Sequence, residues 1–235
     1  MISGLQKMTL LDYPGKVACT VFLQGCNFRC PFCHNSGLLE EKEDELMTID
    51  ALIAFLKKRK GLLDGVCITG GEPTLYAGLK DLVAKIKAEG FLVKLDTNGT
   101  RPKVLQELIS ENLLDYVAMD IKNAPAHYGE TVGVPNVTLN NIEESVKLLL
   151  QDAVDYEFRT TVMDELHDES TMLDMGNWLK QLGEGRMPQR FFLQPYADRD
   201  SVLAPGLSTP SKEKLTKMAE IMAPFAQKVE IRALD

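Results

Sequence analysis

The sequence predicts an α/β fold, a partial (β/α)6 barrel whose six strand–helix units leave one side open. Short apolar runs rich in β-branched residues alternate six times with segments whose apolar residues recur at helical spacing. Right-handed crossovers between successive parallel strands put the helices on the outside. Unusual polar residues follow the first four strands, at the strand ends where such barrels carry their working residues.

The predicted strands are short and bounded by turn residues. They lie at 17–23, 66–69, 91–96, 116–120, 156–162 and 190–194, and 229–232 predicts a closing edge strand. Residues 1–15 fall outside the repeat, as an extension or a hairpin that turns at the DYPG segment. Because six units are fewer than the eight of a closed barrel, we expect the barrel to stay open.

Each strand is followed by a helical pattern. The expected helices lie near 48–61, 79–90, 103–111, 139–151 and 171–182, with a last one from about 210. Thr48 is a good N-cap and Gly61 a good stop for the first helix. Pro210 suits the first position of the last helix, directly after Thr209.

Composition limits the classes of function. The 235 residues fit one domain, 1–235, and a formal charge of -8 disfavours nucleic acid and anionic membranes as partners. No apolar run approaches the roughly 20 residues that a membrane-spanning helix needs, and the first residues lack a signal peptide pattern. We therefore expect a cytoplasmic protein, in which five cysteines indicate a metal site rather than disulfides.

Three cysteines, Cys26, Cys30 and Cys33, lie within eight positions after the first strand. Thiolates bind soft metals, so the alternatives are zinc and an iron–sulfur cluster. A structural zinc site needs four ligands, and His34 is strained as the fourth because it is adjacent to Cys33. An iron–sulfur cluster with one iron not held by protein fits best.

The GGEP segment, residues 70–73, follows the second strand. The glycines allow a close approach of the backbone to a ligand, and Pro73 stiffens the turn. Glu72 supplies an acceptor for an ammonium group. Alone, this segment would be an ordinary Gly-Gly turn, but its place beside the cysteines indicates a site for an amino-acid-like ligand.

Further charged residues lie on the fourth and fifth strands. Alternation on 156–162 turns Glu157, Arg159 and Thr161 inward, and we expect Arg159 to bind a ligand or to pair with a glutamate. His127 and His167 lie in polar loops and are predicted to be surface residues. The long 123–138 segment is predicted to act as a lid.

CNFRCPFC matches the CxxxCxxC signature and resembles radical S-adenosylmethionine enzymes, and GGEP after the second strand strengthens the resemblance. The resemblance implies a partial TIM-like barrel and a [4Fe-4S] cluster on Cys26, Cys30 and Cys33, with S-adenosylmethionine on the fourth iron. It also implies that Phe32 packs beside the adenine. The implied contacts to the methionyl amino group come from Gly70, Gly71, Glu72 and Pro73.

KLDTNG and VAMDIK resemble segments of glycyl radical enzyme activating enzymes. That resemblance implies a monovalent cation beside S-adenosylmethionine, with Lys122 a candidate partner for the ligand carboxylate. The implied cation ligands are Asp96, Thr97, the backbone of Met119, and Asp120. In LQPYA, Ala197 stands where the formate-lyase activator has a ribose-binding histidine, which leaves the ribose to Gln194, to Tyr196 or to another group.

Along nearly its whole length, the chain is most similar to proteins assigned as anaerobic ribonucleoside-triphosphate reductase activating proteins. The resemblance implies reductive cleavage of S-adenosylmethionine, with an electron from a flavodoxin- or ferredoxin-type donor, and a glycyl radical made on a partner enzyme. Alternatives are a formate-lyase-like partner, or a small-molecule or ribosomal peptide substrate. From another class, a zinc-stabilised binding module stays open.

Overall fold

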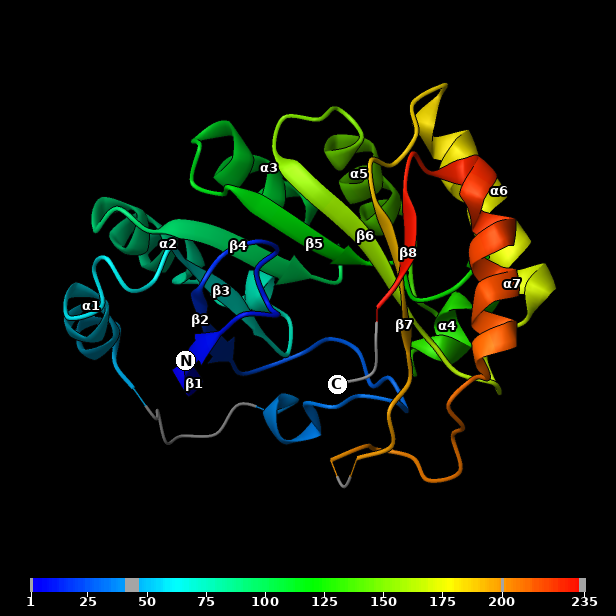
Figure 1. Cartoon of the computed structure of the whole chain (residues 1–235), viewed down its shortest axis with the longest axis horizontal. Helices are drawn as coiled ribbons and strands as arrows, with labels where there is room; N and C mark the ends of the chain where they lie inside the picture. Colours follow the sequence, from blue (N-terminus) through cyan, green and yellow to red (C-terminus); the bar gives the residue numbers. More distant parts are fainter. Residues whose placement is uncertain (1, 41–46, 200, 233–235) are drawn as a thin grey trace.

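The computed structural model describes residues 2–40, 47–199 and 201–232. Its strands form one 8-stranded sheet in chain order, and all neighbouring strands are parallel except β1 and β2. The strands are β1 (Ile2–Thr9), β2 (Ala18–Leu23), β3 (Gly65–Gly70), β4 (Leu92–Thr97), β5 (Tyr116–Asp120), β6 (Asp155–Val162), β7 (Phe191–Pro195) and β8 (Val229–Ile231). Figure 1 shows the sheet curving, with its helices outside the curve.

The six expected strand–helix units are present, because each strand from β2 to β7 is followed by a helix. The helices are α1 (Ile49–Lys57), α2 (Leu79–Ala88), α3 (Pro102–Ser110), α4 (Tyr128–Thr131), α5 (Asn140–Leu149), α6 (Glu169–Gly183) and α7 (Lys212–Met222). Thr48 caps α1 as predicted, since its hydroxyl accepts a hydrogen bond from the Ala51 amide at 3.1 Å. The partial barrel predicted from the sequence is confirmed.

The predicted start of the last helix is wrong by two residues. Helix α7 begins at Lys212, and Ser211 is its N-cap, accepting a hydrogen bond from the Lys214 amide at 3.1 Å. Thr209 is not available as the cap because its hydroxyl donates to the carbonyl of Tyr196 at 2.7 Å. That contact ties residues before α7 to the end of β7.

Residues 2–15 form a β-hairpin together with β2. Strand β1 runs antiparallel to β2, with Thr9 opposite Ala18. The DYPG turn is present: the Lys16 amide donates to the Tyr13 carbonyl at 3.1 Å, and Gly15 has a φ of +68°. Proline followed by a left-handed glycine is typical of a type II turn. The partner strand of this hairpin is β2, the first strand of the repeat.

The 123–138 segment braces the cysteine-bearing loop. Tyr128, Thr131 and Val132 are buried, and the Val132 carbonyl accepts a hydrogen bond from the Arg29 amide at 2.8 Å. A side chain at Gly133, which has a φ of +66°, would meet the Arg29 carbonyl oxygen at 2.3 Å. The role of this segment as a lid stays a prediction. None of the described helices is long and apolar enough to cross a membrane.

His127 is exposed as predicted, whereas the prediction that His167 lies on the surface is wrong. His167 is only 1% exposed because the chain after β6 folds back onto the loop after β5. Its Nε2 lies 2.9 Å from the carbonyl of Lys122, and its Nδ1 accepts from the Met163 amide at 3.4 Å. Burial lowers the pKa of His167 to about 4.

This pKa predicts a pH-dependent stability. The unfolded histidine, with a pKa of about 6.5, binds a proton that the folded one excludes, so its contribution is present above about pH 6.5 and is lost as the pH falls toward 4. Between pH 7.5 and pH 5 we expect His167→Gln to remove about 2 kcal/mol of the wild-type loss in the free energy of urea unfolding. The matched variant His127→Gln should keep the wild-type pH dependence; an unchanged profile in His167→Gln would contradict the assignment.

Candidate active site

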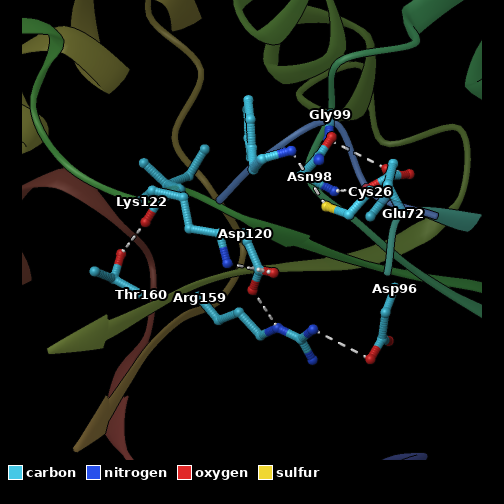
Figure 2. Close-up of polar contacts among 12 residues, drawn as sticks. Cys26, Glu72, Asp96, Asn98, Gly99, Asp120, Lys122, Arg159 and Thr160 are labelled. Carbon is cyan, nitrogen blue, oxygen red and sulfur yellow. Dashed lines mark hydrogen bonds and ion pairs between the residues drawn. The ribbon is translucent and has the colours of Figure 1, made fainter. Parts of the chain in front are cut away.

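A cavity of about 190 Å³ lies at the carboxyl ends of β2 to β7. Figure 2 shows its polar side chains converging from neighbouring strands. The cavity brings together these residues singled out in the sequence: Cys26, Cys30, Cys33, Phe32, Gly70, Gly71, Glu72, Asp96, Thr97, Asp120, Lys122, Arg159 and Gln194. Pro73 and Met119 are both buried, and neither lines the cavity.

The loop after β2 carries the three cysteines. Its backbone is held by the Gly25 amide, which donates to Leu38 at 2.8 Å, and by the Cys33 amide, which donates to Cys30 at 3.0 Å. Cys30 is buried, whereas Cys26 and Cys33 are partly exposed. Burial raises the pKa of Cys30 to about 12 and raises that of the other two thiols. Metal binding at this loop therefore releases thiol protons.

The arrangement of thiols suits a cluster. Among the described residues, no three Cys, His, Asp or Glu side chains already converge on a point where one metal ion would sit. A [4Fe-4S] cluster makes no such demand, because each cysteine binds a different iron. Three free thiols on one short loop, all facing the same cavity, fit the cluster that the resemblance implies.

The glycines of GGEP let the end of β3 pack closely on the cysteine loop. A Cβ at Gly70, whose φ is +127°, would lie 2.1 Å from the Leu23 carbonyl oxygen, and one at Gly71 would lie 2.1 Å from that of Gly25. The Gly71 and Glu72 amides donate to these same two carbonyls, at 2.9 and 2.7 Å. The close approach that was expected toward a ligand is, in this structure, an approach between the backbone at the end of β3 and the backbone at the end of β2.

Glu72 has a structural role besides the predicted one. Its buried carboxylate lines the first cavity and already accepts hydrogen bonds from groups of this chain, three at Oε1 and one at Oε2. Its contact with an ammonium group stays a prediction. The donors are the Thr74 amide (3.0 Å), the Thr74 hydroxyl (2.5 Å), the Thr97 hydroxyl (2.8 Å) and the Asn98 amide (2.6 Å). Glu72 therefore joins the turn after β3 to the end of β4.

Asn98 continues this connection to the cysteine loop. The side-chain nitrogen of Asn98 donates to the side-chain oxygen of Asn27 at 2.9 Å. The side-chain nitrogen of Asn27 in turn donates to the Thr100 hydroxyl at 3.0 Å. Asn27 lies between Cys26 and Cys30, so the network links the first cysteine's neighbourhood to β4. Neither asparagine was among the predicted site residues, although Asn27 lies within CNFRC and Asn98 within DTNG, which was a usable signal.

Five charged side chains on β4, on β6 and at the end of β5 form an alternating ladder. Figure 2 shows four of them, Asp96, Arg159, Asp120 and Lys122. Arg159 is its centre: its Nε donates to Asp120 at 2.6 Å and its Nη2 to Asp96 at 3.1 Å. Lys122 donates to the other oxygen of Asp120 at 2.9 Å, and Lys94 donates to the other oxygen of Asp96. We refer to Lys94, Asp96, Arg159, Asp120 and Lys122 as the charge ladder.

The charge ladder keeps its carboxylates ionised. Burial by itself raises the pKa of Asp120, but Arg159 and Lys122 lower it well below the ordinary value. The pKa of Asp96 is also lowered, since Arg159 and Lys94 outweigh its burial. The pKa values of Lys94 and Lys122 are raised, because their aspartate partners outweigh the opposing effect of burial.

The inward orientation predicted for Arg159 is confirmed, but its partners are aspartates. Glu157, the inward-facing glutamate of the same strand, accepts from Arg232 at 2.5 Å and from Tyr116 at 2.7 Å. The alternation of β6 could not reveal this, because Arg232 follows β8, far along the chain. Asp120 and Lys122 do point to the same side, as expected from their spacing.

Of the residues predicted to contact the adenosine part of the ligand, Phe32 and Gln194 line the cavity and Tyr196 does not. The Lys122 ammonium lies 5.7 Å from the centre of the Phe32 ring, which places this aromatic side chain in the cavity wall. Gln194 lines the cavity, but Tyr196 is 1% exposed, donates to Asp198 at 3.1 Å, and is not part of the wall. His34, without a predicted role, joins the cysteine loop to β7 because its Nε2 lies 2.8 Å from the carbonyl of Ala197.

A second cavity, of about 410 Å³, adjoins the first. Leu11 and Asp12, after β1, lie on one side of it, and Arg232, after β8, lies on another. Since β1 and β8 are the end strands of the sheet, this cavity lies at the seam of the open barrel. The residues that line both cavities are His34, Asp96, Arg159, Thr161 and Gln194.

Comparison with known proteins agrees with this site. The model of the Radical SAM superfamily matches residues 20–175. A protein of Methanocaldococcus jannaschii, provisionally named a glycyl-radical enzyme activating enzyme, is 33% identical over 248 aligned positions that cover 100% of this chain and 97% of the relative. The pyruvate formate-lyase 1-activating enzyme of Escherichia coli K12 is 26% identical, and the match covers 97% of both chains.

Solved structures share the fold. A domain of the pyruvate-formate lyase-activating enzyme of Bacteroides vulgatus superimposes with a TM-score of 0.59 at 22% identity, covering 72% of this chain and 99% of that one. Streptococcus suis SuiB, bound to its precursor peptide SuiA, superimposes with a TM-score of 0.71 at 12% identity, covering 91% and 48%. With the superfamily match and the full-length relative, the cysteine loop and its cavity assign this chain to the radical S-adenosylmethionine superfamily and, within it, to the glycyl-radical enzyme activating enzymes.

Proposed function

We propose that this protein generates a glycyl radical on a partner enzyme, and that the partner is an anaerobic ribonucleoside-triphosphate reductase. The observation that carries the proposal is the second cavity at the seam between β1 and β8, which shares five wall residues with the cysteine cavity. An extended segment of another protein that enters at this seam reaches the cysteine cavity without the barrel having to open.

The rim of the seam suits a protein partner. Met8, Leu10 and Leu11 are exposed apolar side chains at the end of β1 and in the turn that follows it. Leu11 and Asp12 also line the second cavity, so the exposed apolar residues continue into its wall. Apolar side chains beside a polar cavity are typical of protein docking sites.

The residues of the first cavity have separate proposed roles. Cys26, Cys30 and Cys33 would hold the [4Fe-4S] cluster that the superfamily uses, and Phe32 and Gln194 would border the adenosine part of S-adenosylmethionine. The cluster supplies the electron for reductive cleavage of S-adenosylmethionine, from which the hydrogen-abstracting radical arises. This chain contributes orientation: Arg159 and Asp120 of the charge ladder pair within the cavity wall, and Glu72 fixes the turn beside the cysteines.

The relatives support the class of partner. The full-length relatives are named as activators of glycyl-radical enzymes, and the match to the Escherichia coli formate-lyase activator spans nearly both chains. The choice of the ribonucleotide reductase over a formate-lyase partner rests on the resemblance of the opening segment TLLDYPGKVACTVFLQGCNFRCPFCHN. The activase role and the identity of the partner enzyme are therefore tested separately.

The test is anaerobic and has two steps. The purified protein is reconstituted with iron and sulfide, reduced, and mixed with S-adenosylmethionine, and the formation of 5′-deoxyadenosine is measured. A ribonucleoside-triphosphate reductase from the same organism is then added, and its glycyl radical is sought by electron paramagnetic resonance. We expect a radical signal that requires both proteins and S-adenosylmethionine.

A formate-lyase-type enzyme from the same organism serves as the matched partner. A radical on that enzyme and none on the reductase would reassign the partner while keeping the activase role. Deoxyadenosine without a radical on either protein would favour the alternative, a small-molecule or peptide substrate. A protein that binds one zinc ion and no iron–sulfur cluster would contradict the proposal altogether.

A further inference from the structure

The two aspartates predicted to bind a monovalent cation have no free carboxylate oxygen. The oxygens of Asp96 face Lys94 and Arg159, and the oxygens of Asp120 face Arg159 and Lys122. Each of the four oxygens thus has a cationic side chain of this chain as its partner. A metal cation bound to these oxygens would share each of them with an ammonium or guanidinium group.

The other two predicted ligands fit no better. The Thr97 hydroxyl donates to Glu72 at 2.8 Å and accepts from the Gly99 amide at 3.1 Å. Met119 is fully buried and lies outside the cavity wall. Oxygen donors directed at a common point are what an alkali ion needs, whereas the oxygens of Asp96 and Asp120 face lysine and arginine nitrogens and the Thr97 hydroxyl faces Glu72.

The charge of the ladder also opposes a further cation. Lys94, Arg159 and Lys122 carry three positive charges and Asp96 and Asp120 two negative ones, which leaves a net charge of +1. All five side chains are largely shielded from water, the most exposed being Asp120 at 19%. The repulsion between this net positive charge and a further cation is therefore screened less than it would be at the protein surface.

We propose that Lys94 is a positioning residue whose fixed ammonium supplies the positive charge that a monovalent cation would otherwise bring to Asp96. The binding of S-adenosylmethionine by this protein is then independent of alkali ions. The ladder as a whole presents its excess positive charge to the carboxylate of the ligand. The proposal rests on the superfamily's cosubstrate and not on which enzyme is the partner.

Lys94 is built for this position. It lies on β4 two residues before Asp96, so both side chains point to the inside of the barrel. Only 2% of its side chain is exposed, and besides Asp96 its ammonium lies 3.6 Å from the Cys67 sulfur. An isolated ammonium at such a site would be costly, whereas one paired with a carboxylate is tolerated. Unlike a hydrated ion, this charge cannot leave the site.

The experiment measures binding of S-adenosylmethionine to the anaerobic, cluster-loaded protein in sodium, potassium or choline chloride at one ionic strength. For the wild type we expect dissociation constants that agree within about twofold, which is less than the coupling of about fivefold or more typical of a true effector. Thermal unfolding of the protein without S-adenosylmethionine, in the same three salts, gives a second readout that does not depend on catalysis. Its midpoint should likewise be the same in all three.

Lys94→Met removes the ammonium and keeps the length of the side chain. In choline we expect this variant to bind S-adenosylmethionine about tenfold more weakly than the wild type, and sodium or potassium to recover about threefold or more of that loss. Its unfolding midpoint should also rise when choline is replaced by either alkali ion. The matched control is Lys87→Met, which breaks a pair with Asp115 outside the cavity and should show no response to the cation.

The outcomes separate clearly. Wild-type affinity that falls more than about threefold in choline would show that a metal cation is needed beside Lys94, and would overturn the proposal. A Lys94→Met protein that binds like the wild type in choline, or that binds weakly and is not rescued by alkali ions, would overturn it as well. If that variant does not fold, the wild-type comparison still decides, because it requires no substitution. None of these outcomes depends on a glycyl radical in a partner.

Discussion

Replacing Cys30 with alanine is expected to abolish cluster binding and, with it, the cleavage of S-adenosylmethionine. Cys30 is the buried member of the cysteine triplet, and no other described cysteine lies on the cavity wall besides Cys26 and Cys33. The loss of deoxyadenosine formation should exceed about 100-fold, since even residues that only orient metal ligands cost 10- to 100-fold when changed. Iron and sulfide analysis after anaerobic reconstitution, with the charge-transfer absorption of the cluster, gives the direct readout.

Cys19→Ala is the matched control. Cys19 is fully buried on β2 and packs in the hydrophobic core, outside both cavities. Its replacement should leave the iron content and the deoxyadenosine yield at wild-type values. A Cys30→Ala protein that still held a complete cluster, or a Cys19→Ala protein that lost it, would show that the triplet has been assigned incorrectly.

Replacing Glu72 with glutamine is expected to lower the free energy of unfolding even in the absence of any ligand. The carboxylate accepts four hydrogen bonds in a buried position, and a glutamine amide offers one acceptor oxygen and two donors of its own. Buried donors left without partners cost about 1–3 kcal/mol each, so we expect a loss of about 2–4 kcal/mol in urea unfolding of the protein without S-adenosylmethionine. Hydrogen exchange at the amides of 97–100 should accelerate.

The matched control for Glu72→Gln is the same substitution at an exposed glutamate. Glu107→Gln, on the exposed face of α3, removes a carboxylate that pairs with Lys80 and should leave stability and hydrogen exchange unchanged. If Glu72→Gln instead kept the wild-type stability and only weakened binding of S-adenosylmethionine, Glu72 would be a direct ligand of the methionyl ammonium, as the sequence suggested. The two roles are therefore distinguished by a measurement made without the ligand.

Much of the fold could be predicted because its signals are local. The strands β2 to β7 are short and show apolar runs or, in β6, an alternation of apolar and polar residues. Helices that follow them show buried stripes, such as Leu79, Leu82, Val83 and Ile86 on α2. The last helix shows the limit of such signals: Pro210 and Thr209 form a good local start, but Thr209 is drawn to the Tyr196 carbonyl. His167 was likewise misplaced, because polar neighbours in the chain do not reveal burial under a distant loop.

The position of the candidate site could be predicted from the strand order. Parallel strands end at the same edge of a sheet, so the residues after β2, β3, β4 and β5 had to meet once the strand order was right. What could not be predicted is which partner each charged group takes. Lys94 had a signal, since it stands two positions before Asp96 on a predicted strand, but the alternation alone does not say that its ammonium bonds Asp96.

By itself, the sequence determined the repeating strand–helix order, the three-cysteine loop and the edge of the barrel where the site lies, because these follow from spacing along the chain. Only the tertiary structure decided that the Glu72 carboxylate is occupied by Thr74, Thr97 and Asn98, and that the four oxygens of Asp96 and Asp120 face lysine and arginine. The physical reason is that a buried charge takes the partners nearest in space. Those partners depend on the register between strands that are far apart in the sequence.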